Sequence, residues 1–325
     1  MNAQAHQLYA GLPCFFQITG VVEPTIHVKC EALNAAGSIK IKPALRMIED
    51  LEKQGRLKKG GTLIESSSGN LGIAVSMIAA SRGFKFICVV DPNAAQYSVS
   101  AMRAVGAAVI VVDQKDENGG YLGSRIALIE SMCRADPGLV WINQYANDSN
   151  WQAHFDTTAP EILREFPRVD HLFIGTGTTG TLMGCARYFR QHSPHTRITA
   201  VDPEGSVTFG TPSKPRRIPG IGTSRRPELL DESLIDAVVH VPEIETVRLC
   251  RELATQGILM GGSTGSVIAA IKRSSRLLGR TDVVVTIMPD LGSKYLDTIY
   301  NDEWVERHYG DSTELQKVAE LEHER

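Results

Sequence analysis

Three glycine-rich segments of the chain have the residue types of an anion-binding loop. They are residues 65–70 (ESSSGN), 175–180 (GTGTTG) and 261–265 (GGSTG), and each leads from an extended segment into an expected helix. In such a turn, backbone N–H groups and the positive end of the helix dipole converge, which favours a phosphate or a carboxylate. A tight turn without a ligand explains any one loop, but it explains three of them poorly.

The segment 175–180 also matches the dinucleotide-binding pattern G-x-G-x-x-G. An expected strand precedes it, an expected helix follows it, and Asp202 ends the next expected strand, where an acid would bind a ribose. The pattern therefore permits an NAD-dependent oxidoreductase. Hydroxyl side chains in and beside the loop instead suit a terminal phosphate, because a pyrophosphate requires bare glycine. These hydroxyl residues are Thr176, Thr178, Thr179 and Thr181.

The loop 65–70 carries more hydrogen-bonding side chains than a helix start requires. Ser66, Ser67, Ser68 and Asn70 surround Gly69, whereas capping needs only one such residue. The surplus suits a loop that binds a carboxylate.

A lysine and a serine complete the residues that could do chemistry. Lys40 ends the turn 34–40 (NAAGSIK) just before an expected helix. It is either a solvated side chain or a Schiff-base lysine whose amine is kept available by burial. Ser263 either caps the helix that follows it or binds a heterocyclic nitrogen.

Helical and strand patterns alternate along the chain. We expect helices at 43–54, 72–82, 98–105, 121–134, 159–165, 181–192, 245–256 and 265–278, and strands at 62–65, 85–90, 108–112, 171–174, 198–201 and 282–288. This alternation predicts an α/β fold of two domains with mostly parallel, twisted sheets. The smaller, N-terminal domain is expected at 35–146 and the larger, C-terminal domain at 1–34 and 147–325, with the ligand in the cleft between them.

Composition excludes several classes of function. The chain has 34 basic and 37 acidic residues, so no nucleic-acid or anionic-membrane partner is indicated. Its 6 cysteines have no C-x-x-C spacing and its 9 histidines form no ligand motif, so we expect reduced thiols and no metal. A signal segment and an apolar run of bilayer length are both missing, which favours a cytoplasmic protein.

Taken together and in this order, the four motifs resemble those of the cysteine synthase / cystathionine β-synthase family of pyridoxal-phosphate (PLP) enzymes, which has fold type II, like the tryptophan synthase β subunit. The resemblance covers about residues 12–304. It implies PLP as the cofactor and Lys40 as the catalytic lysine that holds it. It further implies that Asn70 binds the cofactor's 3′-oxygen and Ser263 its pyridine nitrogen. The implied phosphate-binding residues are Gly175, Thr176, Gly177, Thr178 and Thr179, and the implied carboxylate-binding residues are Ser66, Ser67, Ser68 and Gly69.

Residues 62–74, 120–122, 141–151 and 219–225 are similar to one branch of that family, which joins O-phospho-L-serine to L-glutamate on the route to L-2,3-diaminopropionate for siderophores. This resemblance implies small amino-acid substrates, a homodimer, and Tyr145 and Arg225 as substrate-binding residues. A cysteine synthase that uses sulfide, and a binding protein that keeps the fold without catalysis, are the alternatives. The chain departs from the family at Lys40-Ile41-Lys42, where Lys-Asp-Arg is usual, and from the branch at Gly177, where serine is frequent.

Overall fold

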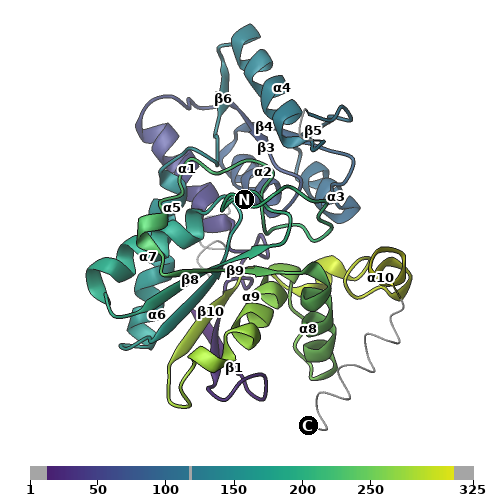
Figure 1. The fold of residues 1–325 in the computed structure, drawn as a ribbon. Coiled ribbons are helices and arrows are strands. Elements are labelled where there is room, and N and C mark those ends of the chain that lie inside the picture. Colours follow the sequence, from purple (N-terminus) through teal and green to yellow (C-terminus); the bar gives the residue numbers. More distant parts are fainter. Residues whose placement is uncertain (1–12, 117–118, 311–325) are drawn as a thin grey trace.

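A computed structural model describes residues 13–116 and 119–310 of the chain. Its strands form two sheets, which lie in the upper and lower parts of the view in Figure 1. None of the helices in these residues is both long and apolar enough to cross a membrane. The α/β class predicted from the sequence is confirmed, because both sheets are built mainly from parallel strands joined through helices.

The larger sheet has six strands in the order β1-β2-β10-β7-β8-β9. Their bounds are β1 Cys14–Ile18, β2 Ile26–Cys30, β7 His171–Gly175, β8 Arg197–Pro203, β9 Ala237–Val241 and β10 Val284–Met288. Only β1 and β2 pair in antiparallel fashion in this sheet, with Cys14 opposite Cys30. Every residue of β10 is buried, as expected for a strand covered on both faces.

The smaller sheet has four parallel strands in the order β5-β4-β3-β6. Their bounds are β3 Thr62–Ser66, β4 Lys85–Val90, β5 Ala108–Val111 and β6 Leu139–Trp141. One face packs against α1 (Ile41–Lys53), α2 (Asn70–Arg82) and α3 (Gln96–Ala104), and the other against α4 (Leu122–Ala135). The two faces follow from the alternation along β3, where Leu63 and Ile64 belong to different apolar clusters.

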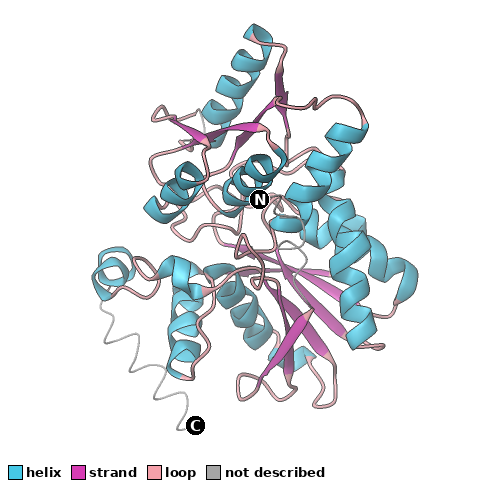
Figure 2. Ribbon diagram, turned by 180° about the vertical axis from the view of Figure 1, so that it is seen from behind, coloured by secondary structure: helices cyan, strands magenta, loops and turns pink. Residues whose placement is uncertain are grey.

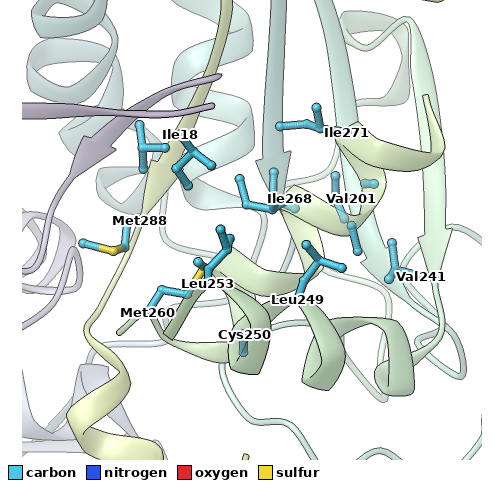
Figure 3. Packing of buried hydrophobic residues seen from close by; sticks show 14 of the residues in the cluster. Ile18, Val201, Val241, Leu249, Cys250, Leu253, Met260, Ile268, Ile271 and Met288 are labelled. Atoms are coloured by element: carbon cyan, nitrogen blue, oxygen red, sulfur yellow. The ribbon is translucent and has the colours of Figure 1, made fainter. Parts of the chain in front are cut away.

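Helices also cover both faces of the larger sheet (Figure 2). One face packs against α8 (Glu243–Thr255) and α9 (Gly262–Arg273), whose side chains interlock with those of the strands in Figure 3. The other face packs against α6 (Ala159–Glu165) and α7 (Gly180–His192). The chain reaches α6 through α5 (Ser149–Ala153) and a π-helical turn, η2 (His154–Thr158), and ends its described part in α10 (Asp302–Tyr309).

The N-terminal hairpin β1–β2 and the strands after residue 170 share one sheet, and the strands between residues 62 and 141 form the other. The expected domains at 35–146 and at 1–34 with 147–325, their boundaries and the cleft between them stay predictions. Residues 1–12 and 311–325 of the expected larger domain lie outside the described residues.

Candidate active site

The predicted loops lie at the carboxyl ends of parallel strands. Residues 66–69 join β3 to α2, and residues 175–179 join β7 to α7. The third loop reaches the same end of the larger sheet, because the Gly261 N–H donates to the carbonyl of Asp290, just beyond β10. The lysine turn is also held there, since the Ile39 N–H donates to the Pro289 carbonyl at 2.8 Å. The fold therefore brings together motifs that are more than 200 residues apart in sequence.

The lysine turn is shaped by Asn34 and a glycine. The Asn34 Oδ1 accepts from the N–H of Ala36 at 3.0 Å, and its Nδ2 donates to the Ser38 carbonyl at 3.0 Å. Gly37 has φ +60°, a conformation that side chains rarely adopt. This turn leads directly into α1, with Lys40 at its N-cap position. Burial lowers the pKa of the Lys40 amine to about 8, although the Asp290 carboxylate acts in the opposite direction.

The three serines of the loop 66–69 have different partners. Ser67 Oγ accepts from the Gly72 N–H at 3.0 Å, so Ser67 satisfies the first turn of α2. Ser68 Oγ donates to Asp91 Oδ2 at 2.8 Å and accepts from Arg125 Nη1 at 2.7 Å. Ser66 Oγ is buried without a hydrogen-bond partner in the described part of the chain. Only Ser67 therefore serves the first turn of α2, and the hydroxyls of Ser66 and Ser68 are not used for capping.

Two buried side chains, Glu65 and Gln144, hold the backbone of Ser66 in this loop. Glu65 Oε1 accepts from the Ser66 N–H at 2.8 Å, and Gln144 Nε2 donates to the Ser66 carbonyl at 3.0 Å. Burial raises the pKa of Glu65 to about 7. Asn150 continues the connection, because its Nδ2 donates both to the Gln144 carbonyl at 2.7 Å and to Thr178 Oγ1 at 3.1 Å. A chain of hydrogen bonds therefore links the serine loop (residues 66–69) with the glycine–threonine loop (residues 175–179).

The glycine–threonine loop, residues 175–179, leads into α7 at Gly180, which lies very close to Asn150. A Cβ on Gly180 would lie 2.1 Å from Asn150 Oδ1. Thr179 has φ +65° and is the N-cap of α7. Thr176 Oγ1 donates to Asp202 Oδ1 at 2.7 Å, and Asp202 is fully buried. Asp202 thus binds a hydroxyl of the loop inside the protein, in place of the ribose that a dinucleotide site would present.

The serine of the third loop does not cap its helix. Gly261 is the N-cap of α9, and no side chain caps that helix. Ser263 is buried within the first turn. A Cβ on Gly261 would lie 1.9 Å from Asp290 Oδ1, so this glycine leaves space for a carboxylate. Of the two interpretations of Ser263, the helix cap is therefore not observed.

Candidate substrate-binding groups lie on several elements. Tyr145 is partly buried, and burial raises the pKa of its phenol, while the nearby Arg125 and Arg216 act to lower it. Arg125 pairs with Asp91 at 3.3 Å, and its side chain is 11% exposed. Arg225 pairs with Glu228 at 3.0 Å, and its side chain is 56% exposed. Sequence reasoning did not identify Arg125, because an arginine in the first turn of a helix resembles a solvated one.

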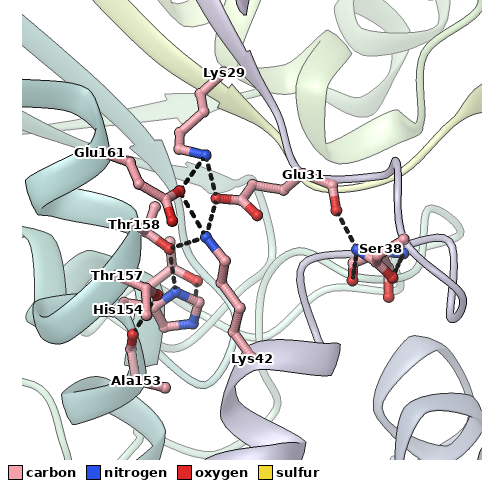
Figure 4. Close-up of polar contacts among 11 residues, drawn as sticks. Lys29, Glu31, Ser38, Lys42, Ala153, His154, Thr157, Thr158 and Glu161 are labelled. Carbon is pink, nitrogen blue, oxygen red and sulfur yellow. Dashed lines mark hydrogen bonds and ion pairs between the residues drawn. The ribbon is translucent and has the colours of Figure 1, made fainter. Parts of the chain in front are cut away.

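A buried group of two lysines and two glutamates supports the start of α1 (Figure 4). We call Lys29, Glu31, Lys42 and Glu161 the Lys–Glu cluster. Lys29 Nζ lies 2.8 Å from Glu31 Oε1 and 2.7 Å from Glu161 Oε2, and Lys42 Nζ lies 2.7 Å and 3.0 Å from the same two atoms. Although burial acts against both shifts, the opposite charges raise the pKa of Lys29 and lower that of Glu161. The ion pairs thus favour the charged forms of Lys29 and Glu161.

The cluster continues towards the glycine–threonine loop. Lys42 Nζ donates to Thr158 Oγ1 at 3.3 Å, and this hydroxyl lies 3.0 Å from His154 Nδ1. His154 Nε2 in turn lies 3.2 Å from Thr181 Oγ1, at the start of α7. Burial and the neighbouring lysines lower the pKa of His154 well below its ordinary value, so the imidazole is neutral. One chain of polar contacts therefore joins the start of α1 to the start of α7.

The donor set fits PLP. A buried amine of lowered pKa suits an aldehyde, N–H groups and hydroxyls at the start of α7 suit a phosphate, and a hydroxyl that caps nothing suits a ring nitrogen. The chain belongs to the family of pyridoxal-phosphate dependent enzymes, whose sequence pattern matches residues 11–290. PLP is accordingly its cofactor, and the prediction made from the four motifs is confirmed at this level.

Individual members of this family are similar to the chain over most of its length. The chain is 44% identical over 284 residues to the N-(2-amino-2-carboxyethyl)-L-glutamate synthase of Ralstonia nicotianae, covering 87% of this chain and 84% of that enzyme. The crystal structure of O-ureido-L-serine synthase superposes with a TM-score of 0.81 at 32% identity, covering 88% of this chain and 91% of that one. The O-acetylserine dependent cystathionine beta-synthase from Helicobacter pylori gives 0.83 at 30% identity, covering 92% and 99%.

Proposed function

We propose that this chain joins O-phospho-L-serine to L-glutamate, releasing phosphate and forming N-(2-amino-2-carboxyethyl)-L-glutamate, a step towards L-2,3-diaminopropionate for siderophores. The similarity to the Ralstonia enzyme carries the proposal. The arginines near Tyr145 add support, because both substrates are rich in anionic groups. A cysteine synthase is the second candidate, and it is favoured by Gly177 at the position where the branch often has serine.

Lys40 is the proposed catalytic residue. Bound PLP withdraws electrons from the substrate's Cα and so makes the Cα proton acidic. Lys40 would hold the cofactor by its aldehyde carbon while no substrate is bound. The same amine would act as the base that removes the Cα proton and later returns it. With a pKa of about 8, roughly a tenth of this amine is neutral at pH 7, enough for a general base.

The loops would hold the rest of the cofactor. The N–H groups at the start of α7, with the loop of Gly175, Thr176, Gly177, Thr178 and Thr179, would bind the phosphate. The Thr176 hydroxyl already donates to Asp202, so we assign it to shaping the loop. Ser263 would face the ring nitrogen as a neutral partner, and Asn70 would bind the 3′-oxygen.

The loop of Ser66, Ser67, Ser68 and Gly69 would bind the carboxylate of the amino acid. Ser68 and Gly69 are the partly exposed members of this loop, whereas Ser66 and Ser67 are buried. Arg125 contacts this loop and is largely desolvated, so we assign it to a phosphate or carboxylate of the substrates. The role predicted for Arg225 stays a prediction, and its exposed pair with Glu228 makes Arg125 the stronger candidate.

The assembly and the compartment are further parts of the proposal. We infer a homodimer and a cytoplasmic location, which are supported by the family resemblance and by six cysteines that are all free thiols. Sedimentation of the purified protein would test the dimer.

Product analysis tests the reaction. With ¹⁵N-labelled glutamate and O-phospho-L-serine, the label should appear in N-(2-amino-2-carboxyethyl)-L-glutamate. Arg125→Gln should lower kcat/KM for one substrate by about ten- to a hundredfold, equivalent to 1.5–3 kcal/mol, while Arg225→Gln should change it by less than about twofold. Failure of the labelled product to form would refute the proposed reaction. A larger effect at Arg225 than at Arg125 would refute only the assignment of the arginine.

A further inference from the structure

Asp290 lies where the segments of the proposed cofactor site meet. It follows β10, and its backbone forms a β-bridge with Ser38 in the lysine turn. Its carbonyl accepts from the Gly261 N–H at 3.2 Å, at the start of α9. The residue is 1% exposed, so its carboxyl group is removed from water. A buried carboxyl group requires polar or charged partners to offset its desolvation.

The partners of the carboxylate are unevenly distributed. Asp290 Oδ2 accepts from Asn70 Nδ2 and from the Tyr295 hydroxyl, both at 2.7 Å. Asp290 Oδ1 has no hydrogen-bond partner within residues 13–116 and 119–310. It occupies the space that a side chain on Gly261 would otherwise fill. Asp290 Oδ2 therefore holds Asn70 and Tyr295 in place, whereas Oδ1 makes no hydrogen bond with the described residues.

Asn70 is held at both ends of its amide. Lys294 Nζ donates to Asn70 Oδ1 at 2.7 Å and to the Gly37 carbonyl at 2.9 Å. An ammonium group can only donate and a carboxylate can only accept, so these two neighbours define which end of the amide is which. The Asn70 NH₂ group thus points to Asp290, and its second N–H is available to another acceptor.

The charge of Asp290 acts on the amines of two lysines, Lys40 and Lys294. Burial lowers the pKa of both amines, and Asp290 raises both. Asp290 also acts to raise the pKa values of Tyr295, Tyr300 and Cys250. Burial raises the pKa of each of these three, with that of Cys250 at about 12, so they are neutral near pH 7. Burial raises the pKa of Asp290 itself, while the hydrogen bonds from Asn70 and Tyr295 and the charges of the two lysines act to lower it. The carboxylate of Asp290 in turn opposes the desolvation of the Lys40 amine.

We propose that Asp290 is a positioning residue of the reaction, which orients Asn70 towards the cofactor and acts through its negative charge as the counter-ion of the Lys40 amine. The inference rests on the proposed role of Lys40. The proposed role depends on the charge of Asp290 as well as on its shape. If the role were purely structural, a neutral side chain of equal size would leave the pKa of Lys40 unchanged. Aspartate to asparagine is that replacement, since it keeps the volume and removes the charge.

The test measures how readily Lys40 reacts with an amine reagent at different pH. The cofactor-free full chain is acetylated competitively across a pH series, and the peptide carrying Lys40 is quantified by mass spectrometry. Asp290→Asn should lower the midpoint for Lys40 by about one pH unit or more, since the loss of a nearby opposite charge has this size of effect. Asp202→Asn is the matched control. It removes another fully buried carboxyl group beside the site and should leave the Lys40 midpoint unchanged.

Each outcome decides the proposal. An unchanged midpoint in a folded Asp290→Asn variant, judged by circular dichroism, overturns it. If that variant does not fold, Asp290→Ser supplies a smaller neutral side chain and should produce the same downward shift, whereas an unshifted midpoint there also overturns the proposal. The visible absorption of the holoenzyme separates this result from the proposed function. A wild-type holoenzyme that lacks the absorption of a lysine-bound cofactor would contradict the role of Lys40 itself.

Discussion

Replacing Lys42 by methionine would remove one of the two cations of the Lys–Glu cluster while keeping most of the side chain's volume. The ammonium group contacts Glu31, Glu161 and Thr158 at 2.7, 3.0 and 3.3 Å. Without it, two largely buried carboxylates share the single charge of Lys29. The cluster then changes from neutral to one net negative charge, which low-polarity surroundings stabilise poorly.

The expected loss of stability follows from this change. Removing one partner of a fully buried ion pair costs about 3–5 kcal/mol. Lys42 is 19% exposed and Lys29 remains, so we expect about 2–3 kcal/mol in the free energy of unfolding. At roughly 2–4 °C per kcal/mol, the melting temperature should fall by about 4–12 °C. Because Lys42 stands two residues after Lys40 in α1, affinity for the cofactor should fall as well.

Thermal unfolding followed by circular dichroism, together with cofactor titration, would measure both effects. Lys53→Met is the control on the same helix, since Lys53 is 70% exposed and lies 3.5 Å from Asp50. It should change the unfolding free energy by less than about 0.5 kcal/mol. The double variant Lys42→Met/Glu161→Gln restores a neutral cluster and should recover part of the loss. If Lys42→Met melts within about 1 °C of the wild type, the cluster is not the support of α1 that we describe.

Three further predictions concern the loops. Lys40→Ala should abolish turnover without unfolding the chain, and borohydride trapping of the cofactor on another lysine would contradict the assignment. Ser263→Asp should slow β-replacement by stabilising a protonated ring nitrogen, whereas unchanged rates and absorption spectra would reduce Ser263 to a packing residue. Because burial raises the pKa of Glu65 from 4.5 to about 7, the folded state keeps a proton that the unfolded state loses. The contribution of Glu65 to stability should therefore fall by about 2 kcal/mol from pH 5 to pH 7, and Glu65→Gln should lack this fall in denaturant titrations.

Local patterns predicted much of the fold. The apolar spacing after Pro43 predicted a helix, and the structure extends it to begin at Ile41. The glycine and hydroxyl content of the three loops predicted anion-binding turns, and hydrogen bonds through Asn70, Gln144 and Gly261 join these turns in the structure. Glycine and hydroxyl residues carry such information because each reports on a local backbone requirement.

Other features depend on contacts that sequence spacing does not reveal. The strand β2 alternates apolar and polar residues, a strand pattern that the sequence analysis missed, whereas β1 is a short apolar run without a strong period. The antiparallel pairing of these two strands was therefore not predicted. Lys294 lies 224 positions from Asn70, and Asp290 lies 220 positions away. In the sequence, each of these residues would be interpreted as an ordinary solvent-exposed side chain. Only the parallel placement of β10 beside β2 brings them to the lysine turn.

A competition between the two pairs of substrates would show which reaction the enzyme catalyses. The holoenzyme would receive O-phospho-L-serine, O-acetyl-L-serine, L-glutamate and sulfide together at equal concentrations, and all products would be quantified by mass spectrometry. Our account predicts N-(2-amino-2-carboxyethyl)-L-glutamate as the main product, with phosphate released in equal amount. Cysteine as the main product would contradict it and would identify sulfide as the nucleophile.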